Sequence, residues 1–199
     1  MSSPDAKRER ILAAAWHFFM EHGFADTTTL QIATRAKVSK RELYALVGNK
    51  EAMLAAAIAE RGARMRLPEG FPAPVDRASL RVALRKFGAT MLAEITDPDV
   101  VEVFRLGIAE AKRSPGIAKS LQARGREPAR AALGALLRSA RAARLLQDAD
   151  VGEMTSRFNA LLWGDVVWLL LGLEKAPVGK EIERRAEAAT ASFLALYGK

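Results

Sequence analysis

Cysteine is absent from the 199 residues, and histidine occurs only twice, at His17 and His22. Without cysteine the chain can form no disulfide, no thiolate zinc site and no iron–sulfur cluster, and it has no cysteine nucleophile. The two histidines are five residues apart, about 140° around a helix, which is poor placement for sharing a metal ion. The sequence also lacks a glycine-rich phosphate loop and a nucleophile elbow. These absences argue against an enzyme, and we predict no catalytic residue, metal or cofactor.

Long apolar runs are missing as well. The longest, residues 160–173, is shorter than the ~20 residues of a membrane helix and contains Asp165. The basic and apolar stretch near the N-terminus has no small-residue cleavage site, so a signal peptide is not expected. Together with the absence of cysteine, these features predict a cytoplasmic protein without a membrane partner.

Positive charge, in contrast, is abundant: 31 Lys and Arg against 23 Asp and Glu give a formal net charge of +8. Such an excess favours an anionic partner such as nucleic acid. It is concentrated in residues 110–144, where nine basic residues stand against two acidic ones. A solvated helix surface is the simplest interpretation of this basic segment, and attraction of an anionic effector or of flanking DNA are the alternatives.

One strong break divides the sequence. Residues 67–74 contain three prolines and a glycine, which end any preceding helix. Apolar residues on both sides recur at helical spacing, and no run alternates as in a strand. We therefore predict an all-α protein with an N-terminal domain over residues 1–56, whose fourth helix continues to about residue 66, and a C-terminal domain over residues 67–199. Further helices are expected over residues 76–96, 98–112, 118–146, 151–173 and 180–197.

Two capping boxes mark the starts of two short helices in the N-terminal domain. The sequences TTLQ at residues 28–31 and SKRE at residues 39–42 each place a hydroxyl residue three positions before Gln or Glu. In such a box the hydroxyl accepts from the third amide of the helix, and the Gln or Glu side chain bonds back to the cap. Helices over residues 29–36 and 40–47, joined by a three-residue turn, follow the helix-turn-helix plan.

One face of the second short helix carries groups suited to reading DNA. With Leu43 pointing inward, Lys40, Arg41, Tyr44 and Ala45 share the opposite face. Cations there can meet phosphates or guanine edges, and an apolar group can meet a thymine methyl. Helix N-termini add further phosphate anchors. A helical hairpin with ordinary solvated charges is the alternative. The predicted DNA contacts are Thr28, Thr29, Lys37, Ser39, Lys40, Arg41, Tyr44, Ala45 and Lys50.

Over about residues 8–56 the sequence resembles the N-terminal domain of the TetR family of transcriptional regulators. The matching patterns are ILxAAxxxFxxxGF at residues 11–24, TTxxIAxxAxVS at 28–39, LY at 43–44 and KExxL at 50–54, all without gaps. The resemblance implies an all-α homodimer, usually a repressor. It also implies a C-terminal domain that binds a small effector and whose last two helices form the dimer bundle.

Two positions depart from the family pattern. Lys37 stands where the family often has glycine in the turn, and a positive φ at a non-glycine residue costs about 1 kcal/mol. The turn is therefore expected to be reshaped, or Lys37 to reach DNA. Val47 replaces a frequent aromatic residue at the end of the second short helix, which changes how the following helix docks.

The last two predicted helices favour self-association. Residues 151–173 are apolar on most of the helix circumference after Phe158, so this helix needs cover on all sides. The final helix carries a smooth alanine stripe that permits close approach of another helix. A four-helix interface built from two chains covers both, and a monomeric bundle with a thick core is the alternative. The predicted dimer contacts are Trp168, Ala188, Ala191 and Ala195.

A ligand pocket in the C-terminal domain is marked only by aromatic and methionine side chains with a few polar ones. At helical spacing such residues also make plain core, which is the simpler interpretation. The candidate lining residues are Phe87, Met91, Phe104, Phe158 and Trp163, with Arg105, Asn159 or Asp165 as polar contacts.

These patterns predict a sequence-specific DNA-binding transcriptional regulator, a repressor by the resemblance, whose operator affinity changes with an unidentified small-molecule effector. A ligand-independent architectural DNA-binding protein is the alternative. Such a protein would show little sequence preference, and its salt dependence would reflect phosphate contacts alone.

Overall fold

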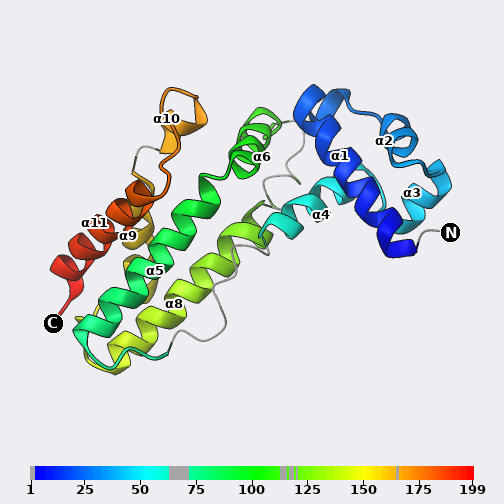
Figure 1. Ribbon diagram of the computed structural model, residues 1–199. Helices are drawn as coiled ribbons and strands as arrows, with labels where there is room; N and C mark the ends of the chain where they lie inside the picture. The colour runs from blue at the N-terminus through cyan, green and yellow to red at the C-terminus, as the bar shows by residue number, and fades with distance from the viewer. Residues whose placement is uncertain (1–2, 63–71, 113–115, 117–118, 120, 165) are drawn as a thin grey trace. The chain divides into compact units, whose positions relative to one another are not determined.

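A computed structural model describes residues 3–62, 72–112, 116, 119, 121–164 and 166–199 (Figure 1). In the described ranges the regular elements are all helices, with one isolated β-bridge between Leu146 and Gly198, which confirms the all-α prediction. The chain forms two compact units, Met1–Arg64 with Glu102–Arg126 and Met65–Val101 with Glu127–Lys199. Each unit therefore draws on two separate stretches of the sequence, and the division falls inside a helix.

The first unit is a small helical domain. It contains α1 (Pro4–Asp26), α2 (Thr29–Ala36), α3 (Lys40–Leu46), α4 (Lys50–Gly62), most of α6 (Pro98–Ala109) and the π-helical turn η1 (Gln122–Arg126). Apolar side chains of α1 to α4 form its core, and Val103 and Leu106 of α6 are buried in the same cluster. The core thus fixes the short helices α2 and α3 against the long helix α1.

Helix α1 begins with a capped first turn and is interrupted near its end. The Ser3 hydroxyl accepts a hydrogen bond from the Ala6 amide, and Pro4 occupies the first turn. Gly23 has a φ of 80°, which interrupts the helical path, and the chain then resumes a helical turn up to Asp26. Across this interruption the rings of Phe19 and Phe24 lie 5.3 Å apart.

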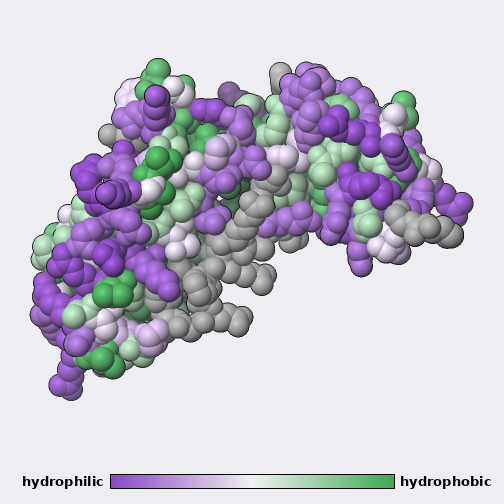
Figure 2. Space-filling view, in the orientation of Figure 1, coloured by the Kyte–Doolittle hydropathy of each residue, from purple (hydrophilic) through white to green (hydrophobic). Residues whose placement is uncertain are grey.

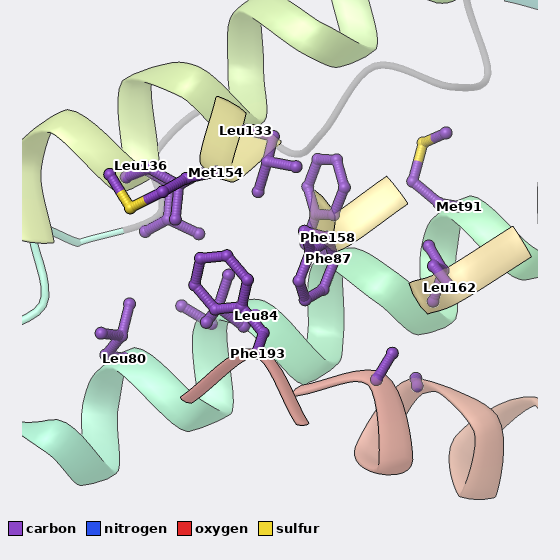
Figure 3. Close-up of a cluster of buried hydrophobic side chains, with 14 of the residues drawn as sticks. Leu80, Leu84, Phe87, Met91, Leu133, Leu136, Met154, Phe158, Leu162 and Phe193 are labelled. Carbon is purple, nitrogen blue, oxygen red and sulfur yellow. The ribbon is translucent and has the colours of Figure 1, made fainter. Parts of the chain in front are cut away.

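The second unit is a helical bundle around a phenylalanine-rich core. It contains α5 (Arg77–Ile95), α8 (Glu127–Ala142), α9 (Val151–Trp163), α10 (Val166–Leu170) and α11 (Lys180–Tyr197). Helix α11 packs along α5 and α9, and α8 packs on α9. The fully buried rings of Phe87, Phe158 and Phe193 come from three different helices and meet at the centre (Figure 3).

Two predicted helices differ most from those of the structure. The apolar run expected as one helix over residues 151–173 is broken at Gly164, whose φ is 48°. Glycine adopts this conformation without the steric cost of a side chain. Helix α9 therefore ends before Gly164, and the apolar run continues in a separate short helix, α10. The helix expected over residues 118–146 is regular only from Glu127, after the π-helical turn.

None of the helices in the described ranges combines the length and the apolar character that crossing a bilayer needs.

Candidate nucleic-acid interface

Both predicted capping boxes are present at the starts of α2 and α3. The Thr28 hydroxyl accepts from the Gln31 amide at 3.3 Å, and the Gln31 side chain accepts from the Thr28 amide at 2.8 Å. The Ser39 hydroxyl accepts from the Glu42 amide at 3.1 Å, and Glu42 accepts from the Ser39 amide at 2.9 Å. These bonds satisfy amides that a helix start leaves free, and they fix where each short helix begins.

Two cations of α1 hold the turn between these helices from both sides. Lys7 donates to Oε1 of Glu42 at 2.6 Å, while Glu42 uses its other oxygen to cap α3. Arg10 donates to the carbonyl of Ala36, the last residue of α2, at 3.1 Å. The first helix therefore acts as the frame that sets the orientation of α3.

The Lys7 ammonium and the Ser39 amide and hydroxyl lower the pKa of Glu42 from 4.5 to about 2. Because the folded protein favours the ionised form, the stabilisation from Glu42 is complete above pH 4.5 and is lost as the pH falls toward 2.

We expect Lys7→Met to raise the pKa of Glu42 toward its ordinary value, measurable by carboxyl NMR titration. Arg8→Met is the matched control, because Arg8 pairs with Glu60. An unchanged Glu42 titration in Lys7→Met would show that this pair does not form in solution.

The face of α3 opposite Leu43 is open to solvent. Leu43 is fully buried, whereas Lys40, Arg41, Tyr44 and Ala45 are all exposed, as the helical spacing predicts. Within the described part of the chain, neither Lys40 nor Arg41 has a hydrogen-bond or ion-pair partner. Both cations are thus available to an external anion.

Residues at the start of α2 lie beside this face. The hydroxyls of Thr29 and Tyr44 are 3.5 Å apart, within hydrogen-bond distance. Thr28 and Ser39 are also exposed, although their hydroxyls already serve the two caps. The structure therefore brings the predicted contacts of α2 and α3 onto one surface, which we call the α2–α3 surface: Thr28, Thr29, Ser39, Lys40, Arg41, Tyr44 and Ala45.

Lys37 occupies the left-handed conformation in the turn, with a φ of 53° and a ψ of 49°. Its amide donates to the Thr34 carbonyl, and the next amide, of Val38, donates to the Ala33 carbonyl at 3.1 Å. This is the helix ending for which glycine is the usual residue. The turn keeps its shape without glycine, and the exposed Lys37 side chain leaves from it.

Lys37→Gly is expected to stabilise the protein by about 1 kcal/mol, because it removes the steric cost of a side chain at positive φ. For a chain of this size we expect a rise in melting temperature of about 2–4 °C. If Lys37 also contacts a phosphate, the same variant will bind DNA more weakly and with a salt slope smaller by about one. Unchanged affinity and salt slope would remove Lys37 from the DNA contacts.

Lys50, at the start of α4, is engaged inside the domain. Its ammonium donates to the carbonyls of Phe24, Ala25 and Thr27 at 2.7, 3.2 and 2.8 Å, and it lies 4.7 Å from the centre of the Phe24 ring. It therefore satisfies carbonyls at the end of α1 and in the link to α2. The predicted phosphate contact of Lys50 stays a prediction, and it would compete with these bonds.

The predicted pocket residues belong to two different units of the chain. Phe87, Met91 and Phe158 are packed in the core of the second unit, and Asn159 is half-buried on α9 (Figure 3). Phe104 and Arg105 belong to the first unit, where Arg105 pairs with Glu102 on the same helix. Asp165 lies outside the described residues.

Trp163, one of the predicted residues, lines a small pocket of the second unit. This small pocket is formed by the end of α5, by α10 and by the segment before α11. Thr96, Lys175 and Arg185 add polar groups to its wall, and Glu181 pairs with Arg185 at 2.9 Å. Proximity of Arg184 and Arg185 lowers the pKa of Glu181 to about 2, so this carboxylate is ionised beside the pocket.

The predicted dimer residues are accessible in the single chain. Ala188, Ala191 and Ala195 are exposed along α11, and Trp168 on α10 is 47% exposed. Figure 2 shows hydrophobic side chains at the surface near α10. Leu161 of α9 and Leu196 of α11 are exposed as well.

The basic segment over residues 110–144 is partly used by the fold. Arg130 donates to the Ser156 hydroxyl at 3.2 Å, and Arg141 donates to the carbonyl of Ala149 at 2.9 Å. Arg126 and Arg138 are exposed on the same stretch. A role of these arginines toward an effector or DNA stays a hypothesis.

Sequence reasoning missed the frame residues Lys7 and Arg10. Their partners are 35 and 26 positions away, and no local pattern predicts contacts over such distances. It also passed over Leu30, a large apolar side chain that is 61% exposed on α2. The available signal was its position within the first capping box, on the side of α2 away from Ile32.

Comparison with known families gives two matches that together cover most of the chain. Residues 11–57 match the family described as bacterial regulatory proteins, tetR family. Residues 82–199 match the AefR-like transcriptional repressor, C-terminal domain. No match is found among curated proteins.

Several solved structures are similar over nearly the whole chain. The flavonoid-responsive regulator FrrA is 32% identical, with a TM-score of 0.80, over 96% of this chain and 97% of its own. A TetR transcriptional regulator from Agrobacterium tumefaciens is 29% identical, with a TM-score of 0.81, over 97% and 94%. A TetR-family regulator from Mesorhizobium loti MAFF303099 shares the fold at 22% identity and a TM-score of 0.81, with both chains fully covered.

Proposed function

Because the chain belongs to the TetR family of bacterial transcriptional regulators, we propose that its α2–α3 surface binds operator DNA, with α3 in the major groove. The protein is a DNA-binding transcriptional repressor with a ligand-binding C-terminal domain, and its family is one of regulators, not enzymes. What we propose is which residues contact the DNA, that two chains form a dimer, and which class of compound releases the protein from DNA.

The exposed cationic face of α3 carries the proposal. Lys40 and Arg41 have no partner among the described residues, and Tyr44 and Ala45 place apolar groups beside them. A helix that enters the major groove needs this combination of cations for phosphates or guanine edges and apolar groups for base edges. Lys7 bonds to Glu42 of α3, and Arg10 bonds to the last carbonyl of α2, so both fix the helix pair to α1.

Selection of bound fragments from random DNA by the full-length protein tests the proposal. We expect enrichment of one approximately palindromic sequence that the protein prefers over competitor DNA at physiological salt. The absence of any enriched sequence, with equal affinity for all duplexes, would instead support the architectural alternative.

Exposed apolar and small side chains on the last helices support a homodimer built from α9, α10 and α11. The stripe of Ala188, Ala191 and Ala195 permits close helix approach, and Trp168 adds an exposed apolar anchor. A two-fold dimer would present two copies of α3 to the two halves of the operator. Light-scattering mass measurement tests this assembly, since a monomer at micromolar concentration would contradict it.

For the effector we propose a flavonoid-like compound as the first class to test. The support is the likeness to FrrA, which is flavonoid-responsive. An effector acts by binding the DNA-free state more tightly than the DNA-bound state. Titration of flavonoids into the protein–operator complex should release DNA, and release by none of them would reject this class.

A further inference from the structure

Two large hydrophobic side chains are exposed on the helix-turn-helix. Leu30 of α2 is 61% exposed and Tyr44 of α3 is 49% exposed. In the described part of the first unit, Ile108 is the other large hydrophobic residue with comparable exposure. The fold does not use Leu30, because α2 buries Ile32, Ala33 and Ala36 instead.

Leu30 is next to the α2–α3 surface along α2, although it is not one of the residues that define that surface. It follows Thr29, whose hydroxyl lies 3.5 Å from that of Tyr44, so the start of α2 adjoins the exposed face of α3. Lys40 and Arg41 share that face with Tyr44. Figure 2 shows hydrophobic atoms at the surface over α2 among mostly hydrophilic neighbours. An apolar side chain beside unpartnered cations is suited to a polyanion that also presents apolar groups.

Duplex DNA presents one such group in the major groove, the C5-methyl of thymine. An apolar contact with the sugar would be the same for every sequence, whereas a contact with this methyl distinguishes a T·A pair from the other pairs. We propose that Leu30 is a specificity-determining residue that contacts a thymine methyl in each operator half-site. The inference rests on the proposed binding of operator DNA by the α2–α3 surface.

Replacement of thymine by deoxyuridine tests the contact directly, because it removes the methyl and keeps the base pair. Each thymine of the selected operator is replaced in turn, and affinity is measured for the wild type and for Leu30→Ala. For the wild type we expect one position per half-site where the replacement weakens binding about fourfold, the equivalent of about 0.8 kcal/mol for one methyl-sized group. Leu30→Ala should bind deoxyuridine and thymine equally at that position.

Ile108→Ala provides the matched control, since Ile108 is exposed to a similar degree, 62%, in the same unit but outside the helix-turn-helix. It should keep the full penalty for the replacement. The inference is overturned if Leu30→Ala retains the wild-type penalty at every thymine, or if only Tyr44→Ala abolishes it. A uniform loss of affinity in Leu30→Ala with unchanged penalties would also overturn it, in favour of a sugar contact. Failure of the wild type to select any operator would count against the proposed function, a separate result.

Discussion

Arg41→Ala is expected to weaken operator binding by about 1–3 kcal/mol, a factor of roughly 5 to 150, and to relax the base preference at one position of each half-site. The reason is the exposed guanidinium on the second residue of α3, close to the helix start that would lead into the groove. Arginine donates two parallel hydrogen bonds to a guanine edge, and alanine donates none. Competition assays with single-base operator variants would measure both effects.

Lys50→Ala is the comparison variant, because it separates the loss of a phosphate contact from the loss of a base contact. A phosphate contact carries no base information, so any loss of affinity should be equal for all sequences. Because the Lys50 ammonium serves three carbonyls of the domain, this variant should also be less stable, by about 1.5–3 kcal/mol. Equal, sequence-independent losses in both variants would show that the base-reading role of Arg41 is assigned incorrectly, and wild-type stability of Lys50→Ala would show that its bonds to the three carbonyls do not stabilise the domain.

Phe158→Ala should destabilise the second unit by about 3–5 kcal/mol. Its ring is fully buried and packs edge-on against Phe87 at 6.0 Å and Phe193 at 5.5 Å between ring centres (Figure 3). Removing it leaves a cavity bordered by three helices that cannot all move inward. Thermal denaturation should show a fall in melting temperature of roughly 6–20 °C.

This change also distinguishes core from pocket. From the sequence alone Phe158 could have lined an effector site, whereas in the structure it is surrounded by side chains of the core. Val82→Ala, at a position 56% exposed in the same unit, should alter stability by no more than about 0.5 kcal/mol. A Phe158→Ala protein with unchanged stability and an altered effector response would show that Phe158 lines the effector site and is not part of the core.

Structural features that depend only on a few neighbouring residues could be predicted from the sequence. The capping boxes of α2 and α3, the exposed side of α3 and the bounds of α11 all follow from local spacing. Each depends on hydrogen bonds within one turn or on the period of a helix, so no knowledge of the rest of the fold is needed.

Features that depend on distant partners could not be predicted. Periodicity shows that α6 has an apolar side but not which core that side faces, and Val103 turns out to be buried with the N-terminal helices. Aromatic residues at helical spacing likewise fit core and pocket equally, which is why Phe87 and Phe158 could not be assigned. At Gly164 the apolar pattern continued through a residue that ends the helix.

The division of the first unit between two stretches of sequence bears on synthesis in the cell. At ~5–20 residues per second, the ribosome releases the helix-turn-helix several seconds before residues 102–126, which complete the same unit. During that interval the apolar surface that Val103 and Leu106 later cover is open to water or to chaperones. A gene fragment that stops at the proline-rich break would make this transient state permanent, so hybrid regulators should exchange α6 and η1 together with the N-terminal helices.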